Sequence, residues 1–150
     1  MYYRSGIGYA SPAVMAMDTV RRVLLHGGSD EGFDASVQFA GRLVETFGAE
    51  LHVVYTVEDP LSAGWTAELA AEKLPELHQA IEAEARERLA RAIPGQQETV
   101  TIAIRAGDPA VELPRYTAEH AIDLAIVHGH DEHARALLDH GHCSVLVLRK

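Results

Sequence analysis

Five short segments of this sequence are almost wholly apolar, and amphipathic or polar segments separate them. These runs lack the strict alternation of polar and apolar residues that marks a half-exposed strand. They therefore predict strands buried on both faces, as in a parallel sheet. The five predicted strands are Arg22–His26 and residues 51–57, 99–104, 123–127 and Ser144–Leu148.

The segments between these strands have the spacing or composition of helices. The first, residues 33–47, repeats apolar residues at helical intervals and ends at Gly48. Pro75 is expected to begin a helix, because the first turn does not use the N–H that proline lacks. Asp108 is expected to cap the helix that starts at Pro109. The expected helices are residues 33–47, 66–73, 75–93, 109–120 and Ala134–His140.

Strands and helices thus alternate along the whole chain. This alternation predicts an α/β domain of three layers, in which a doubly wound five-stranded parallel sheet has helices on both faces. We expect the strand order 3-2-1-4-5, which makes the first and fourth strands neighbours. Ligands of such folds bind beyond the carboxyl ends of the strands where the order reverses. The turn at residues 26–29 should then face the turn at residues 128–130.

Length, charge and cysteine content narrow the class of protein. A chain of 150 residues predicts one domain, which we place at residues 21–150, after an irregular N-terminal arm at residues 1–20. The net charge of -9 argues against a nucleic-acid partner and against anionic membrane surfaces. The apolar runs are too short to span a membrane. A single cysteine excludes an internal disulfide and fits a cytoplasmic protein.

Five segments carry a more specific signal. They are residues 23–29 (VLLHGGS), 48–57 (GAELHVVYTV), 105–110 (RAGDPA), 122–129 (IDLAIVHG) and 140–148 (HGHCSVLVL). In this order and at this spacing they resemble the universal stress protein family over residues 21–149. The resemblance implies the adenine nucleotide alpha-hydrolase-like form of the doubly wound fold.

Departures from the pattern of this family imply that the chain lacks ATP binding. Members of the family that bind ATP or AMP carry a Gly-x2-Gly-x9-Gly-(Ser/Thr) loop, whose backbone N–H groups cradle the phosphates. Counted from Gly129, the residues Glu132, His142 and Cys143 stand where that pattern has Gly, Gly and Ser/Thr, and the segment is shorter than in the family. Gly27 stands where the family has an acid before Gly-Ser. We therefore expect a shortened, degenerate ATP-binding loop.

Two kinds of ligand remain as alternatives at the reversal of strand order. An atypical AMP or ATP pocket would be lined by residues at the matching family positions, namely His26, Gly27, Gly28, Val57, Gly107, His128, Gly129 and His130. A metal or anion site would use the imidazoles that cluster there, because imidazole suits zinc, nickel or copper. Its ligands would be His26, His128, His130 and His133. Against both stands the simpler interpretation that these histidines are exposed or hydrogen-bonding loop residues.

The function that we predict from the sequence is a non-catalytic, dimeric stress-response or regulatory module. The family resemblance implies a homodimer through the last strand, Ser144–Leu148, whose apolar edge would otherwise promote aggregation. Enzymatic alternatives are weaker. Cys143 and His142 are strand neighbours that point to opposite faces, and Ser29 does not stand in a Gly-x-Ser-x-Gly elbow.

Overall fold

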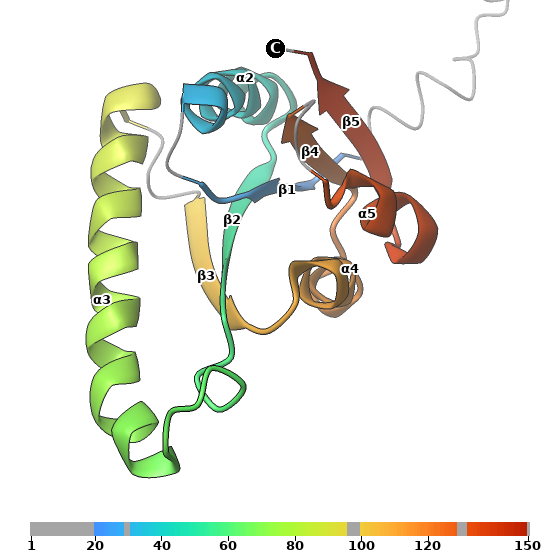
Figure 1. Cartoon of the computed structure of the whole chain (residues 1–150). Helices are drawn as coiled ribbons and strands as arrows, with labels where there is room; N and C mark the ends of the chain where they lie inside the picture. Colours follow the sequence, from blue (N-terminus) through green and yellow to red (C-terminus); the bar gives the residue numbers. More distant parts are fainter. Residues whose placement is uncertain (1–19, 29–30, 96–99, 129–131, 150) are drawn as a thin grey trace, which may run out of the picture.

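A computed structural model describes residues 20–28, 31–95, 100–128 and 132–149, and in these residues strands and helices alternate (Figure 1). The strands are β1 (Arg22–His26), β2 (Glu50–Val57), β3 (Val100–Ala106), β4 (Leu124–His128) and β5 (Ser144–Leu148). The helices are α2 (Glu31–Phe47), α3 (Ala67–Ala92), α4 (Pro109–Glu119) and α5 (Ala134–His140).

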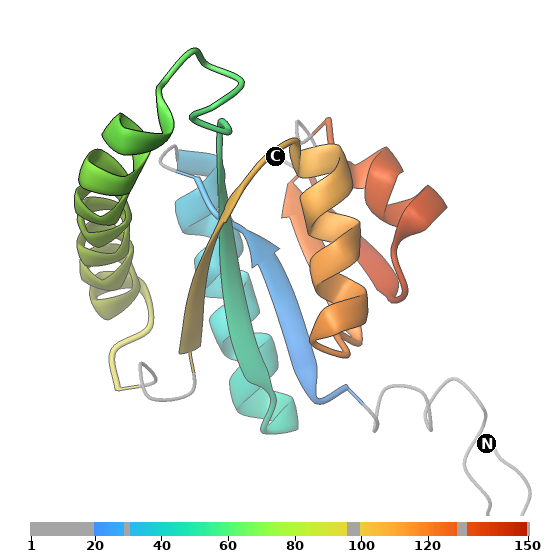
Figure 2. The same cartoon turned by 90° about the horizontal axis from the view of Figure 1, so that it is seen from below.

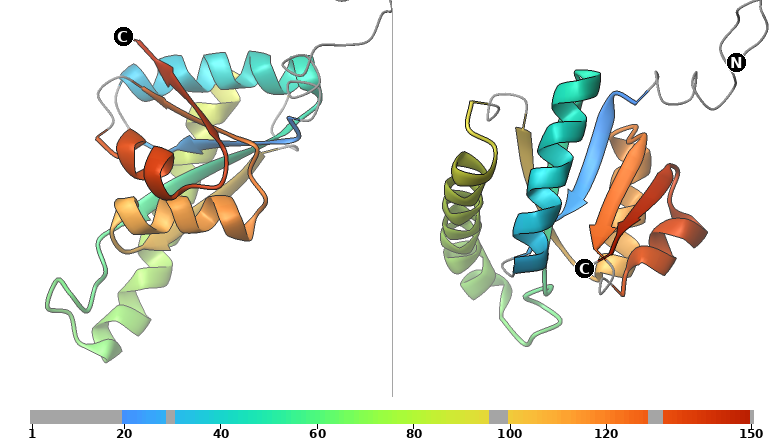
Figure 3. Two further views of the ribbon diagram at one scale, coloured as in Figure 1. Left: turned by 90° about the vertical axis from the view of Figure 1, so that its right-hand side faces the viewer. Right: turned by 90° about the horizontal axis from the view of Figure 1, so that it is seen from above.

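The five strands form one parallel sheet in the order β3-β2-β1-β4-β5, as predicted. Helices cover both faces. Figure 3 shows α2 on one side of the strands and α4 with α5 on the other, and in Figure 2 α4 lies in front of the sheet and α2 behind it. The fold is therefore the doubly wound three-layer α/β/α architecture, with the reversal of order between β1 and β4.

Each face of the sheet has its own apolar core, because the strands bury both of their faces. The core on the side of α2 and α3 includes Val23, Leu25, Phe33, Leu51 and Leu89. The core on the side of α4 and α5 includes Leu24, Val54, Leu113, Tyr116 and Leu137. Alternate residues of β1 thus enter opposite cores, as the period of two in a strand requires.

The second connection differs from the sequence prediction. One continuous helix, α3, replaces the two expected segments, and Pro75 lies inside it rather than at its start. The helix begins at Ala67, before Pro75, because the Thr66 side chain caps it by accepting a hydrogen bond from the Leu69 N–H at 3.1 Å. Residues 67–74 are rich in Ala, Leu and Glu, which favour helix strongly enough to carry one internal proline.

The start of the domain is joined to β4 by polar contacts. The carboxylate of Asp123 accepts hydrogen bonds from the backbone N–H groups of Arg21 at 2.7 Å and Arg22 at 2.9 Å. Val20, which the sequence analysis assigned to the arm, is 8% exposed and packs in the core. The rest of the predicted arm, residues 1–19, lies outside the described residues. Among the helices that are described, none is long and apolar enough to cross a membrane.

Candidate functional site

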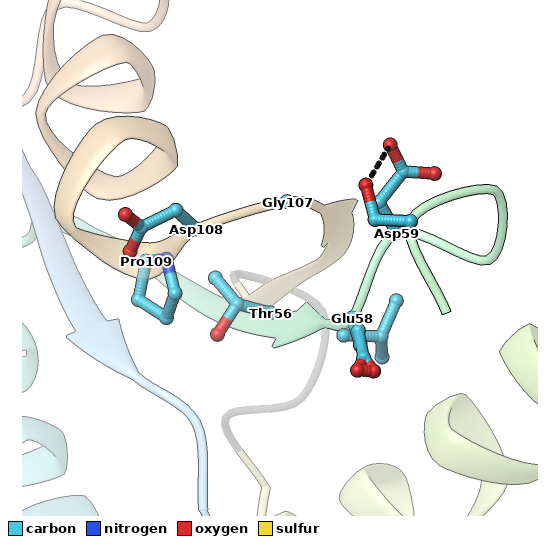
Figure 4. A pocket seen from close by; sticks show the side chains of 8 residues that line it. Thr56, Glu58, Asp59, Gly107, Asp108 and Pro109 are labelled. Atoms are coloured by element: carbon cyan, nitrogen blue, oxygen red, sulfur yellow. Dashed lines mark hydrogen bonds between the residues drawn. The ribbon is translucent and has the colours of Figure 1, made fainter. Parts of the chain in front are cut away.

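A cavity of about 550 Å³ opens at the carboxyl ends of β2 and β3 (Figure 4). The two strand ends are held together by the N–H of Gly107, which donates to the carbonyl of Val57 at 2.9 Å. The loop after β2 and the first turn of α4 supply the other walls. The lining residues are Thr56, Val57, Glu58, Asp59, Ser62, Gly107, Asp108 and Pro109.

The polar lining of this cavity is acidic. Figure 4 shows the carboxylates of Glu58, Asp59 and Asp108 at separate places around it. Two of them also hold the local backbone. Asp59 accepts from the Leu61 N–H at 3.1 Å, and Asp108 caps α4 by accepting from the Ala110 N–H at 3.0 Å. None of the described lining residues is a lysine or an arginine, so the cavity does not offer a phosphate a cationic side chain.

Gly107 has a conformation that other residues rarely adopt. Its φ is +142°, and a Cβ there would lie 3.2 Å from Cγ of Glu112. Glu112 is only 8% exposed, and Arg115 approaches its carboxylate to 2.7 Å. The glycine therefore lets β3 turn sharply over this buried carboxylate and enter α4.

The end of β1 is closed by an aromatic ring. The N–H of Gly27 donates to the carbonyl of Val54 at 2.7 Å, which sets Gly27 beside Tyr55 on the neighbouring strand. A Cβ built on Gly27 would lie 2.7 Å from three ring carbons of Tyr55, closer than real Cβ atoms approach. The ring also meets Phe33 edge-on at 6.1 Å, and burial raises the pKa of Tyr55 to about 12. The space into which a side chain at residue 27 would project is thus filled by Tyr55.

Two of the four histidines predicted as metal ligands lie close together. The rings of His26 and His133 meet edge-on with 5.6 Å between their centroids, and His26 Nε2 lies 3.3 Å from Oγ1 of Thr56. His128 ends β4, opposite Leu148 in the sheet. His130 lies outside the described residues. Within the part of the chain that the structure covers, no three His, Cys, Asp or Glu side chains are grouped to hold a metal ion.

The predicted nucleotide contacts are divided between two places. Val57 and Gly107 line the cavity together, whereas His26 and Gly27 lie at the end of β1, where Tyr55 covers Gly27. Gly28 has room for a Cβ, which would meet Phe33 at an ordinary 3.5 Å. Gly129 lies outside the described residues. The sequence analysis missed both Tyr55 and the acidic lining. The turn signals in residues 58–60 and 107–109 could have identified the lining.

Comparison with known proteins connects this geometry to a family. The model of the universal stress protein family matches residues 19–149. UspA of Lactobacillus plantarum has a TM-score of 0.64 at 21% identity, over 87% of this chain and 98% of its own. A universal stress protein in complex with cAMP has a TM-score of 0.62 at 17% identity, over 87% of this chain and 97% of its own.

A third related structure also carries a nucleotide. The universal stress protein from Archaeoglobus fulgidus in complex with dAMP has a TM-score of 0.56 at 14% identity, over 85% of this chain and 96% of its own. A search of curated proteins gives no match. At these identities the structural likeness establishes the fold, whereas the family model covers nearly the whole chain. This chain is a member of the universal stress protein family.

Proposed function

We propose that this chain is a non-catalytic, dimeric stress-response or regulatory module that does not hold ATP or AMP as nucleotide-binding members of its family do. The observation that carries the proposal is the contact between Tyr55 and Gly27. The family resemblance places an acid at residue 27, and here a tyrosine ring occupies the space that its side chain would need. An adenine nucleotide would therefore lose that contact, and the residues present do not fit it.

The electrostatics of the cavity support the same conclusion. Glu58, Asp59 and Asp108 line the cavity, so a nucleotide bound there would bring its phosphates close to these carboxylates. Like charges repel, most strongly where solvent screens them least. The sequence also lacks the glycine pattern whose N–H groups would offset that repulsion.

The test is thermal unfolding with millimolar ATP, AMP or cAMP, beside the Archaeoglobus fulgidus protein with dAMP as the positive control. A ligand at about 100 times its Kd stabilises the native state by about 2.7 kcal/mol. For a domain of this size that corresponds to a Tm increase of several degrees. We expect no such increase here, and an increase of that size with ATP or AMP would refute the proposal.

An atypical adenine nucleotide site is the second candidate function. The cavity supports it, because about 550 Å³ lies within the range of small-molecule sites, and relatives have been solved with cAMP and dAMP. In this case Val57 and Gly107 would contact the ligand. If calorimetry detects binding, Val57→Trp should abolish it by filling the cavity, whereas Leu138→Trp on the exposed side of α5 should not.

A histidine-bound metal ion is the third candidate, and the pair His26–His133 is the observation that favours it. Calorimetric titration with zinc or nickel ions tests it on protein without an affinity tag. Uptake that is lost in His26→Ala/His133→Ala would support a site. No uptake, or uptake that the substitutions leave unchanged, would eliminate it.

The proposal that the protein is non-catalytic is supported by the state of its one cysteine. Burial raises the pKa of the Cys143 thiol, which keeps it protonated and weakly nucleophilic at neutral pH. We place the protein in the cytoplasm, where a free thiol is stable.

A homodimer through β5 is the assembly that we propose. Among the strands that the structure describes, β5 lies at the end of the sheet and pairs with β4 alone. Val147 on it is 45% exposed. An unpaired, partly apolar edge is a template for another strand, and pairing with a second copy would cover it.

Light scattering after size exclusion tests this interface. We expect a dimer at high micromolar concentration and a shift towards monomer in Val147→Lys, which adds a charge to the edge. Leu138→Lys is the matched control, because Leu138 is 62% exposed on α5. A wild-type monomer, or equal behaviour of the two variants, would contradict the proposed interface.

A further inference from the structure

A cluster of titratable side chains joins α4 to the sheet, outside the lining of the cavity. At its centre is His52 on β2, which is only 6% exposed. Nδ1 of His52 lies 2.6 Å from the hydroxyl of Tyr116 on α4, and Tyr116 is 1% exposed. Apolar packing alone does not explain this buried hydrogen bond between a histidine and a tyrosine.

The hydrogen bonds assign the protonation state of His52. Nε2 lies 3.4 Å from a carboxylate oxygen of Glu50, and an ionised carboxylate can only accept, so Nε2 carries the hydrogen. Nδ1 is then an acceptor, and Tyr116 donates to it. Burial lowers the pKa of His52, and this effect outweighs the opposite influence of Glu50. In this arrangement the imidazole is neutral, because Nδ1 accepts the hydrogen bond from the Tyr116 hydroxyl.

Titratable and charged groups from α4 and its C-cap, from β3 and from β1 surround this contact. On α4, the His120 ring stacks on Tyr116 at 4.0 Å, and Glu119 and Glu112 lie along the same helix. On β3, Arg105 lies 5.0 Å from the centre of the Tyr116 ring, and it donates to Glu119 at 2.6 Å and towards His120 Nε2 at 3.4 Å. On β1, Arg22 lies 3.6 Å from Glu50.

We propose that His52 and Tyr116 form a proton-operated latch that loosens α4 from the sheet on acidification. A proton on Nδ1 of His52 turns it into a donor and leaves the Tyr116 hydroxyl hydrogen without that acceptor in a buried place. Opening α4 exposes the imidazolium ring of His52 to water, so protons favour the open state.

The size of the effect follows from linkage. If His52 stays neutral in the closed state and has an ordinary pKa of about 6.5 when exposed, acidification to pH 5.5 raises the opening constant about tenfold. Folding lowers the pKa of His52. Its contribution to the stability of the closed state is therefore present above the unfolded pKa and is lost as the pH falls below that value. The loss ends when the pH passes the folded pKa.

Hydrogen exchange on the full chain at pH 7.5 and pH 5.5 tests the latch, with rates converted to protection factors. We expect protection of residues 109–119 to fall by up to about tenfold, the limit in which His52 stays neutral in the closed state, whereas protection of residues 31–47 on the opposite face stays unchanged. His52→Asn should remove the pH dependence, because its side-chain oxygen can replace Nδ1 as acceptor without titrating. His140→Asn, an exposed histidine on α5, should behave as wild type.

Three results would overturn the proposal. One is pH-independent protection of α4 in the wild type, and another is the same pH dependence in His52→Asn. The third is an equal loss of protection in α2, which would indicate global unfolding rather than a local opening. If His52→Asn does not fold, NMR titration of the wild-type His52 ring decides: a midpoint below 6.5 supports the latch, and one at or above 6.5 refutes it.

Discussion

Gly27→Ala is the substitution that most directly tests the closure of the β1 end by Tyr55. The added Cβ would lie 2.7 Å from three ring carbons of Tyr55, so the ring must move. The ring is held between the Gly27 backbone and Phe33, which meets it at 6.1 Å. Movement therefore disturbs the core between the sheet and α2.

The expected cost is that of overpacking a core, about 1–3 kcal/mol. Backbone conformation does not add to it, because the φ of Gly27 lies outside the left-handed region. Without the ring, replacing glycine by alanine should instead stabilise by about 0.4–1 kcal/mol, through the lower entropy of the unfolded chain. Whether Gly27→Ala destabilises or stabilises the protein thus depends on the side chain at residue 55.

Urea denaturation followed by far-UV circular dichroism measures this dependence as a double-mutant cycle. Gly27→Ala is made in the wild type, in Tyr55→Phe, which keeps the ring, and in Tyr55→Leu, which removes it. We expect destabilisation in the first two backgrounds and a neutral or stabilising effect in the third. Gly28→Ala is the neighbouring control, because its Cβ would meet Phe33 at an ordinary 3.5 Å.

The reasoning would be refuted if Gly27→Ala had the same effect in all three backgrounds. It would also be refuted if Gly27→Ala and Gly28→Ala were equally tolerated. In either case Tyr55 would not fill the space beside Gly27, and the proposed loss of the nucleotide contact would lose its structural basis.

Three other substitutions test core packing, helix formation and hydrogen bonding elsewhere in the fold. Leu137→Ala should destabilise by about 2–5 kcal/mol in urea, because Leu137 is fully buried, whereas Leu138→Ala beside it at 62% exposure should stay within about 0.5 kcal/mol. Pro75→Ala should raise the Tm by up to the equivalent of about 3 kcal/mol, since it restores an N–H inside α3; a lower Tm would contradict this account. Asp123→Ala should cost about 1–3 kcal/mol, because two backbone N–H groups at the start of β1 lose their acceptor; an unchanged urea midpoint would contradict it.

The fold could be predicted from the sequence because its signals are local. Continuous apolar runs mark doubly buried strands, and their alternation with helices leaves few right-handed topologies. The junction at Asp108-Pro109 could also be predicted from the sequence, since an N-cap and a first-turn proline act within one turn of helix. Pro75 was misplaced because the same residue type fits a first turn and a tolerated interior position, and the cap at Thr66 decided between them.

The candidate site could be predicted only in part. Val57 and Gly107 were named because they stand at matching positions of the family that the sequence resembles, and in the structure they line one cavity. Their contact with a ligand stays a prediction. The acidic lining was not found, since Glu58, Asp59 and Asp108 are three among many carboxylates until the loop after β2 folds back towards α4.

The sequence by itself determined the element order and the doubly wound sheet, because both follow from local patterns of neighbouring residues. Only the tertiary structure decided which residues from distant parts of the chain meet. The contact of Tyr55 with Gly27 depends on the parallel register that sets His26 beside Val54. The pairing of His52 with Tyr116 joins residues that are 64 positions apart. Such contacts are set by how strands align and how α4 packs, and no periodicity along the chain encodes them.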